Sequence, residues 1–272
     1  MTRLSFIVAL GALLLLAIGS AGCGDDKGKP VQYQLTAKQN YDKGLRELKD
    51  ENFAEAIKYF TFTKTRFPFS RYATLAELRV GDAHLARGRY VEAVDAYRQF
   101  IKFHPTHEMT ENGYAHFKIC ESHYKQIPDE WILSPPAYEK DQTSTREALK
   151  EYDLFLAKYP DSKHTKDARK QRATALKKLI DHELYVARFY LSRNKPKGTA
   201  LRLRGILEQF PGTGNEPEIM ILLGQTYLQM EQVDKARDTF KRLIEEHPKD
   251  HNARRARLFL EYIEKRYGRA AT

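Results

Sequence analysis

Apolar residues recur at steps of three and four along most of the chain, which is the spacing of one face of an α-helix. Residues 54–62 and 91–103 follow this pattern closely. Residues 166–190 predict one long helix, and residues 252–267 predict a charged amphipathic helix near the C-terminal end. No segment shows convincingly the two-residue period of a β-strand. The pattern therefore predicts an all-α fold.

The predicted helices share four positions, held by glycine, alanine, an aromatic residue and proline, with spacings of 12, 4 and 8 residues. The three complete sets are Gly44, Ala56, Phe60 and Pro68; Gly81, Ala93, Tyr97 and Pro105; and Gly224, Ala236, Phe240 and Pro248. Two partial sets are Ala148, Tyr152 and Pro160, and Ala187, Leu203 and Pro211 with Thr199 at the alanine position. This recurrence is typical of tetratricopeptide repeats, which are helix-turn-helix units of about 34 residues.

The repeated residue types have a physical reason. Small residues let two helices approach closely, the aromatic ring fills the groove toward the next unit, and proline ends the second helix. We therefore predict a tetratricopeptide-like superhelical solenoid of about five helix pairs with a polar C-terminal capping helix. We expect Ala56, Ala93 and Ala236 to be buried at close helix contacts. An insertion at residues 128–145 predicts an ordered loop or a short extra helix.

The start of the chain has the features of an export signal. Arg3 supplies positive charge, an apolar run covers residues 4–18, and small residues lead to Cys23. The apolar run is too short to span a bilayer comfortably, so we expect residues 1–22 to be removed as a signal peptide. An ordinary signal peptide with a nearby cysteine is the alternative to the more specific interpretation that follows.

The sequence Ser-Ala-Gly-Cys before and at position 23 is similar to the lipobox of bacterial lipoproteins, in which the cysteine sulfur is acylated. The resemblance implies a covalent lipid on Cys23 and no other cofactor. Several acyl chains give stable attachment to a bilayer. Residues 23–34 are polar and predict a lipid-anchored flexible tether. In proteins with this resemblance, an aspartate directly after the cysteine favours retention in the inner membrane. Gly24 stands at that position, so the resemblance implies the periplasmic face of the outer membrane.

Charge and cysteine content narrow the class of protein. The net charge is +10, but basic and acidic residues alternate along the helical patterns, so we expect solvated faces and no nucleic-acid partner. With Cys23 lipidated, Cys120 has no partner for an intramolecular disulfide. Cys120 occupies a small-residue position of the repeat and is expected in the core.

Catalytic and metal-binding patterns are weak. His104, His107, His116 and His123 lie close together in sequence, but no cysteine or carboxylate completes an obvious set of metal ligands. Phosphate-binding loops, nucleophile elbows and zinc-protease motifs are absent from the sequence. We therefore expect no catalytic residues and no metal site. The concave groove of a helical solenoid commonly binds peptides.

Five further segments permit a closer comparison: Arg66–Ala73, Gln99–His107, Asp141–Ala148, Lys158–Ala168 and His182–Tyr190. These segments resemble the BamD family, the repeat lipoproteins of the bacterial machinery that folds β-barrel proteins into the outer membrane. Two positions depart from the family pattern. Ser70 replaces a favoured glycine, and residues 193–198 replace a typical turn, which leaves the geometry of that turn open.

The resemblance implies a non-enzymatic scaffold of the β-barrel assembly machinery with two working surfaces. Residues 35–160 would form the half that binds unfolded outer-membrane proteins, and residues 161–272 would dock the periplasmic domains of a BamA-like barrel-forming subunit. The implied peptide-binding pocket consists of Phe67, Pro68, Phe69, Arg71 and Tyr72, and the implied docking residues are Arg188 and Arg202. For Phe67, a place in the interhelix core is the alternative.

Two further expectations remain open. In the segment around Arg202, Leu201, Ile206, Leu207 and Phe210 can face the core, which would leave Arg202 and Arg204 available to a partner. The alternative to a scaffold of the β-barrel assembly machinery is a pilotin-like repeat lipoprotein that serves secretion or pilus assembly.

Overall fold

The computed structural model describes residues 31–128 and 135–268, so the predicted signal peptide, Cys23 and Gly24 lie outside the described residues. The described part is helical and contains no strand, which confirms the all-α prediction. The α-helices are α2 (Ala37–Lys49), α3 (Phe53–Arg66), α4 (Arg71–Ala86), α5 (Tyr90–Phe103), α6 (Glu108–Glu111), α7 (Tyr114–Lys125), α8 (Thr143–Lys158), α9 (Thr165–Ser192), α10 (Pro196–Gln209), α11 (Glu216–Gln229), α12 (Val233–Glu246) and α13 (His251–Tyr267).

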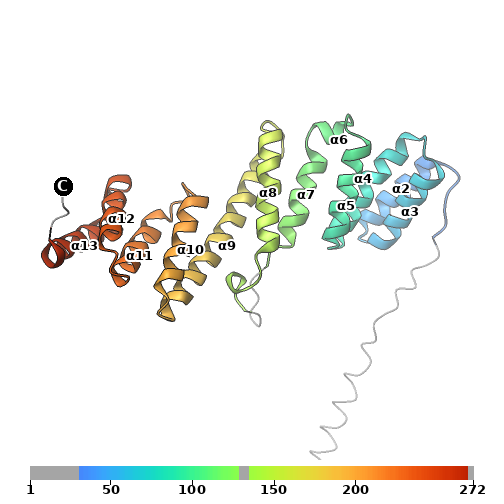
Figure 1. The fold of residues 1–272 in the computed structure, drawn as a ribbon. Coiled ribbons are helices and arrows are strands. Elements are labelled where there is room, and N and C mark those ends of the chain that lie inside the picture. The colour runs from blue at the N-terminus through green and yellow to red at the C-terminus, as the bar shows by residue number, and fades with distance from the viewer. Residues whose placement is uncertain (1–30, 129–134, 269–272) are drawn as a thin grey trace, which may run out of the picture. The chain divides into compact units, whose positions relative to one another are not determined.

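The chain divides into two compact units, with the boundary between Ala83 and His84. The N-terminal unit holds α2, α3 and most of α4, and the C-terminal unit holds the end of α4 and α5 to α13. Within the C-terminal unit, helices α7 to α13 pack on one another in chain order (Figure 1). The division of work between residues 35–160 and 161–272 concerns function and stays a prediction.

The repeat positions form the close contacts that the spacing predicts. A Cβ atom on Gly44 would lie 2.6 Å from Cε1 of Phe60, and one on Gly224 would lie 2.3 Å from Cε1 of Phe240. Each ring thus lies against the glycine of its own helix pair, and Phe240 also stacks on Phe259 of α13, with 5.0 Å between ring centroids. The ring therefore fills the contact within its pair as well as the groove toward the next helix.

The small residues of the second helices are fully buried, which confirms the expectation for Ala56, Ala93 and Ala236. Thr199, which replaces alanine in one set, is also fully buried. Its hydroxyl donates to the carbonyl oxygen of Ala187 at 3.3 Å, so the polar group is satisfied inside the pair.

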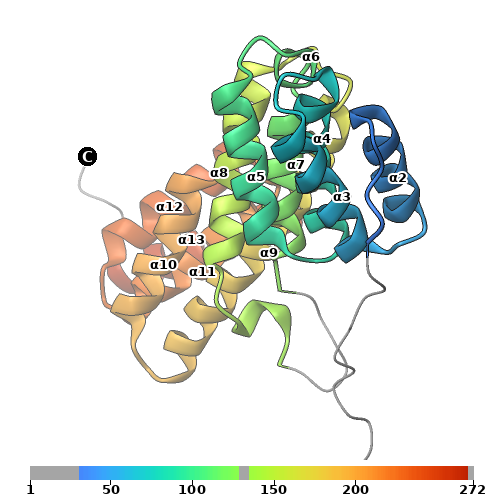
Figure 2. The ribbon, with the colours of Figure 1, turned by 90° about the vertical axis from the view of Figure 1, so that its right-hand side faces the viewer.

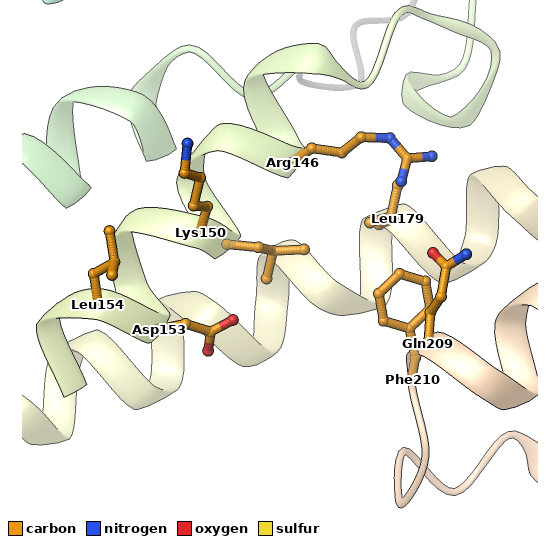
Figure 3. Close-up of a pocket in the computed structure, with 8 residues that line it drawn as sticks. Arg146, Lys150, Asp153, Leu154, Leu179, Gln209 and Phe210 are labelled. Atoms are coloured by element: carbon orange, nitrogen blue, oxygen red, sulfur yellow. The ribbon is translucent and has the colours of Figure 1, made fainter. Parts of the chain in front are cut away.

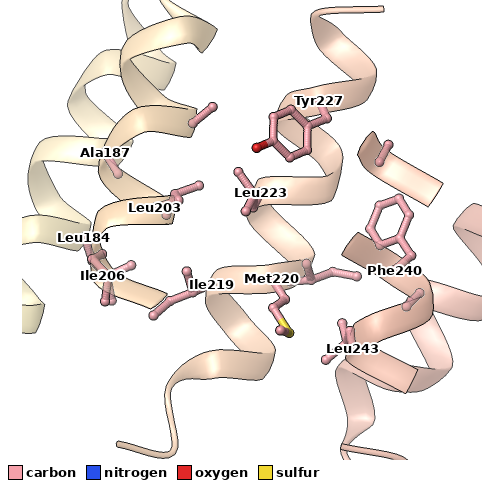
Figure 4. Close-up of a cluster of buried hydrophobic side chains, with 14 of the residues drawn as sticks. Leu184, Ala187, Leu203, Ile206, Ile219, Met220, Leu223, Tyr227, Phe240 and Leu243 are labelled. Atoms are coloured by element: carbon pink, nitrogen blue, oxygen red, sulfur yellow. The ribbon is translucent and has the colours of Figure 1, made fainter. Parts of the chain in front are cut away.

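Buried apolar residues continue from pair to pair in the C-terminal unit. Figure 4 shows Leu203 and Ile206 of α10 facing Ile219 and Leu223 of α11, with Phe240 of α12 on the far side of α11. Each helix therefore buries apolar side chains on two neighbours, as expected for a solenoid.

Five second helices end in the same backbone conformation, one residue before the repeat proline. The residues are Phe67, His104, Tyr159, Phe210 and His247, with φ from −127° to −132° and ψ from 55° to 60°. Proline restricts the preceding residue to conformations outside the α-region, because its ring collides with that residue's backbone. The repeat proline therefore ends each helix at a fixed place.

The remaining predicted elements are present with small changes. The long helix is α9, and the terminal amphipathic helix is α13. The described part of the insertion contains the 3₁₀-helix η1 (Ala137–Glu139), which packs on α9 (Figure 2). Among the described residues, no helix is long and apolar enough to cross a membrane.

Gly224→Ala and Gly205→Ala should change stability in opposite directions. Alanine favours a helix over glycine by about 1 kcal/mol. At position 224 the new Cβ would overlap the Phe240 ring, and overpacking of this kind costs about 1–3 kcal/mol. At position 205 the nearest atom, Nε2 of Gln209, is 3.8 Å away, so the helix preference remains.

Urea unfolding followed by circular dichroism should therefore show a loss of stability for Gly224→Ala and a gain of about 0.5–1 kcal/mol for Gly205→Ala. Shifts of the same sign and size would contradict the close-contact explanation.

Candidate binding surfaces

The five residues of the predicted peptide pocket lie in the turn between α3 and α4 and in the first two positions of α4. Phe69 is fully exposed and Pro68 is exposed, so both are available to a partner. Phe67 is half-buried and meets Phe62 edge-on, with 6.1 Å between ring centroids. The Phe67 ring therefore lies against its own helix, α3, and Phe67 is not one of the buried core residues.

Arg71 and Tyr72 form a pair at the start of α4. The Arg71 guanidinium lies 4.9 Å from the centre of the Tyr72 ring and donates to its hydroxyl at 3.0 Å. Tyr72 packs inward against Tyr41, whereas Arg71 stays exposed. Ser70, the departure from the family pattern, caps this helix, because its hydroxyl accepts from the Tyr72 N–H at 3.2 Å.

Residues 31–35, which we call the N-terminal strap, differ from the predicted flexible tether. The strap has no regular secondary structure, but it lies against α2 and α3. Tyr33 stacks on Phe62 with ring centroids 3.9 Å apart. No sequence pattern predicts this contact, because Phe62 lies almost thirty residues away from Tyr33.

The C-terminal surface is built around a buried carboxylate. Glu183 on α9 is buried, and its two oxygens accept from Arg146 of α8 at 2.5 Å and from Arg202 of α10 at 3.0 Å. Arg202 thus shares one acid with a second arginine, and both arginine side chains remain about half exposed.

Two adjoining hollows, of about 510 and 430 Å³, flank this ion-pair cluster and share Arg146, Gln209 and Phe210. We call them together the α8–α10 groove. Figure 3 shows Arg146 and Lys150 on α8 across from Gln209 and Phe210 at the end of α10. Leu154 and Leu201 line the groove and are exposed. The expectation that Leu201 faces the core is therefore wrong, and Leu203 takes that place because it lies on the inner face of α10.

Arg188 lies on the same helix as Glu183 but does not join the cluster. It pairs with Glu218 of α11 at 2.6 Å, and both side chains are more than half exposed. The two predicted docking arginines thus have different carboxylate partners within the chain.

The cap helix α13 carries an apolar patch, formed by exposed Leu258 and Tyr262, which the sequence pattern did not predict. Leu258 stands ten residues after the repeat proline, as Leu78 and Ile221 do in earlier units. Leu78 and Ile221 are 1% and 3% exposed, whereas Leu258 is 65% exposed. In the described part of the chain no helix follows α13 to cover it. Aligning the repeats by their prolines would have found this patch, and the outward face of the cap is less polar than predicted.

Two histidines of the central region, His107 and His116, make structural hydrogen bonds. His107 accepts from the N–H of Met109 and so caps α6. His116 bonds the Tyr159 hydroxyl at 2.9 Å, and burial together with the nearby Lys158 lowers its pKa to about 4. Within the described ranges, no group of three histidine, cysteine or acidic side chains could hold a metal ion. Cys120 lies in the core, where burial raises the pKa of its thiol.

Glu183→Gln should destabilise the C-terminal unit. The substitution removes the charge that holds Arg146 and Arg202, and hydrogen bonds to charged groups contribute about 1.5–3 kcal/mol each. Because both arginines are about half exposed, we expect a smaller total loss of about 1–2 kcal/mol in the free energy of unfolding. Glu218→Gln is the matched control, since its pair with Arg188 is exposed and should change stability by less than about 0.5 kcal/mol. Equal urea midpoints for the two variants would contradict a structural role for Glu183.

Comparison with known proteins agrees with this architecture. A tetratricopeptide repeat model matches residues 221–272. The chain is 25% identical to "Outer membrane protein assembly factor BamD" of Neisseria gonorrhoeae over 255 residues, which cover 92% of each chain. It is 26% identical to the proteins of the same name from Caulobacter vibrioides, covering 80% of this chain and 68% of that protein, and from Haemophilus influenzae, covering 85% and 88%.

The YfiO family model, described as outer membrane lipoprotein, matches residues 33–243, which are more than half of the chain. This match also confirms the family resemblance that the five sequence segments indicated. The protein therefore belongs to the YfiO (BamD-type) family of outer membrane lipoproteins.

Proposed function

We propose that this protein is a non-enzymatic scaffold lipoprotein of the β-barrel assembly machinery, which aids the folding and insertion of proteins into the bacterial outer membrane. The observation that carries the proposal is the family match over residues 33–243. The relatives that cover most of the chain are named as outer membrane protein assembly factors. A protein that takes part in assembly acts through contacts with other proteins, so we expect the working residues of this chain on the surface of the solenoid.

The N-terminal unit would bind unfolded outer-membrane proteins. Exposed Phe69 offers an aromatic anchor, and Arg71 offers a positive charge beside it. A side chain of each kind suits an extended segment that alternates apolar and polar residues, as β-barrel strands do. Aromatic residues and arginine are also the residue types that contribute most to binding at interfaces.

The C-terminal unit would dock the periplasmic domains of a barrel-forming subunit. Around Glu183, two guanidinium groups face one carboxylate, which leaves one positive charge at the edge of the α8–α10 groove. A carboxylate of the partner could bind both arginines there, while exposed Leu154 and Leu201 would contact apolar residues. Arg188 could extend this contact by exchanging Glu218 for an acid of the partner.

Co-purification tests the proposed function. A C-terminal tag on the lipidated chain in mild detergent should recover a large β-barrel protein with periplasmic domains. Arg202→Met should reduce that recovery several-fold, because an interface arginine whose loss leaves a carboxylate unpaired contributes about 2 kcal/mol or more. Arg169→Met, at an exposed position of α9, should recover as much as the wild type.

Methionine is the suitable replacement because glutamate at position 202 would face Glu183 and disturb the fold. Recovery of a secretin in place of the β-barrel protein would favour the pilotin-like alternative. Equal recovery from all three chains would remove Arg202 from the docking surface.

Replacing Cys23 tests the proposed anchor. Attachment through acyl chains on the sulfur predicts that Cys23→Ala leaves an unprocessed or soluble periplasmic protein. Fractionation in high salt, which weakens electrostatic contact with lipid, should place the wild type with the outer membrane and the variant elsewhere. A variant that still sediments with outer membranes in cells lacking its partners would show that lipidation is not the anchor.

A further inference from the structure

The N-terminal strap is held chiefly through its backbone. The N–H of Gln34 donates to Oδ1 of Asn40 at 2.8 Å, and Nδ2 of Asn40 donates to the Gln34 carbonyl at 2.8 Å. The Tyr59 hydroxyl donates to the Gln32 carbonyl at 3.2 Å. Side chains of α2 and α3 thus form hydrogen bonds with the peptide groups of Gln32 and Gln34, two alternate strap residues. A neighbouring β-strand would bind the same kind of groups.

The Tyr33 side chain makes the aromatic contacts of the strap, although 43% of it remains exposed. The Tyr33 ring stacks on Phe62 and meets Tyr59 edge-on, with 5.8 Å between the latter centroids. Leu35 is 93% exposed. Any extended peptide with an aromatic residue between two others could therefore make the contacts that the strap makes.

The receptor side of this contact is built into the fold. Asn40 is fully buried and Tyr59 nearly so, hence both polar groups need a partner in the place that the strap occupies. Phe62 continues the aromatic surface to Phe67, at the edge of the turn that carries exposed Phe69. The strap site is thus continuous with the proposed peptide surface.

We propose that residues 31–35 are an internal ligand, which occupies an extended-peptide site formed by Asn40, Tyr59 and Phe62 until an incoming peptide displaces it. This inference rests on the proposed peptide-binding function of the N-terminal unit. The backbone of an incoming peptide would form the same hydrogen bonds with Asn40 and Tyr59 as the strap does, so the exchange loses no hydrogen bond. Because the strap is attached, its effective concentration is high, and it excludes peptides that make no further contact with Phe69 or Arg71.

The chain's own strap sequence provides a direct probe. A fluorescent peptide copying residues 29–36 should bind the full lipidated chain weakly, because the attached strap competes. Tyr33→Ala weakens the attached strap and leaves the site intact, so the same peptide should bind that variant about five- to tenfold more tightly. Leu35→Ala is the matched control and should bind the peptide with wild-type affinity.

Two further measurements separate release of the strap from loss of structure. Hydrogen exchange should show the Gln34 N–H protected in the wild type and unprotected in Tyr33→Ala, with unchanged protection in α2 and α3. Adding Phe62→Ala to Tyr33→Ala should abolish the gain in peptide affinity. Wild-type affinity in a folded Tyr33→Ala variant would overturn the proposal. The probe is the chain's own sequence, so an unchanged affinity would contradict only the role of the strap. The proposed assembly function is tested separately, by co-purification.

Discussion

The contact between an aromatic ring and a glycine on the paired helix sets the geometry on which the rest of the structure depends. At Gly44 and Gly224 the ring lies where a Cβ atom would be, so the two helices approach more closely than any other residue would allow. The Phe240 ring also stacks on Phe259 of the following helix. The Phe240 side chain thus fixes both the pairing of α11 with α12 and the stacking of α13. A displaced ring at this position would shift the helices that stack after it.

The proposed binding surfaces consist of the groups that this stacking leaves uncovered. Repeat prolines end the second helices in one conformation, so the turns that follow present their residues at regular places. Phe69 is exposed because it lies in such a turn, and Leu258 is exposed because the described solenoid ends with α13. Apolar groups in these places are costly in a protein that acts alone, and they suit one that works by holding other proteins.

A few of the many charged residues shape the proposed docking surface. Ion pairs between largely exposed residues of one helix, such as Lys38 with Asp42 and Arg242 with Glu246, contribute little to stability. The cluster around Glu183 differs because it joins three helices and one of its members is buried. It therefore fixes Arg146 and Arg202 at the edge of the α8–α10 groove while leaving their outer N–H groups free to reach solvent. A single arginine in the same place would be mobile and less selective for a carboxylate.

The sequence by itself determined the repeat class, the helices and the buried positions 56, 93 and 236, because each depends on residue types at fixed short spacings. The family was indicated separately, by the resemblance of five segments. Tertiary structure alone decided which residues meet across large separations. Tyr33 with Phe62 and Arg146 with Glu183 are contacts between segments whose spacing carries no period. Leu201 and Leu203 show the same limit within one helix. The two leucines are about 200° apart around α10, because each residue of an α-helix advances about 100°. Only the direction from which α9 and α11 pack decides that Leu203 is buried and Leu201 exposed.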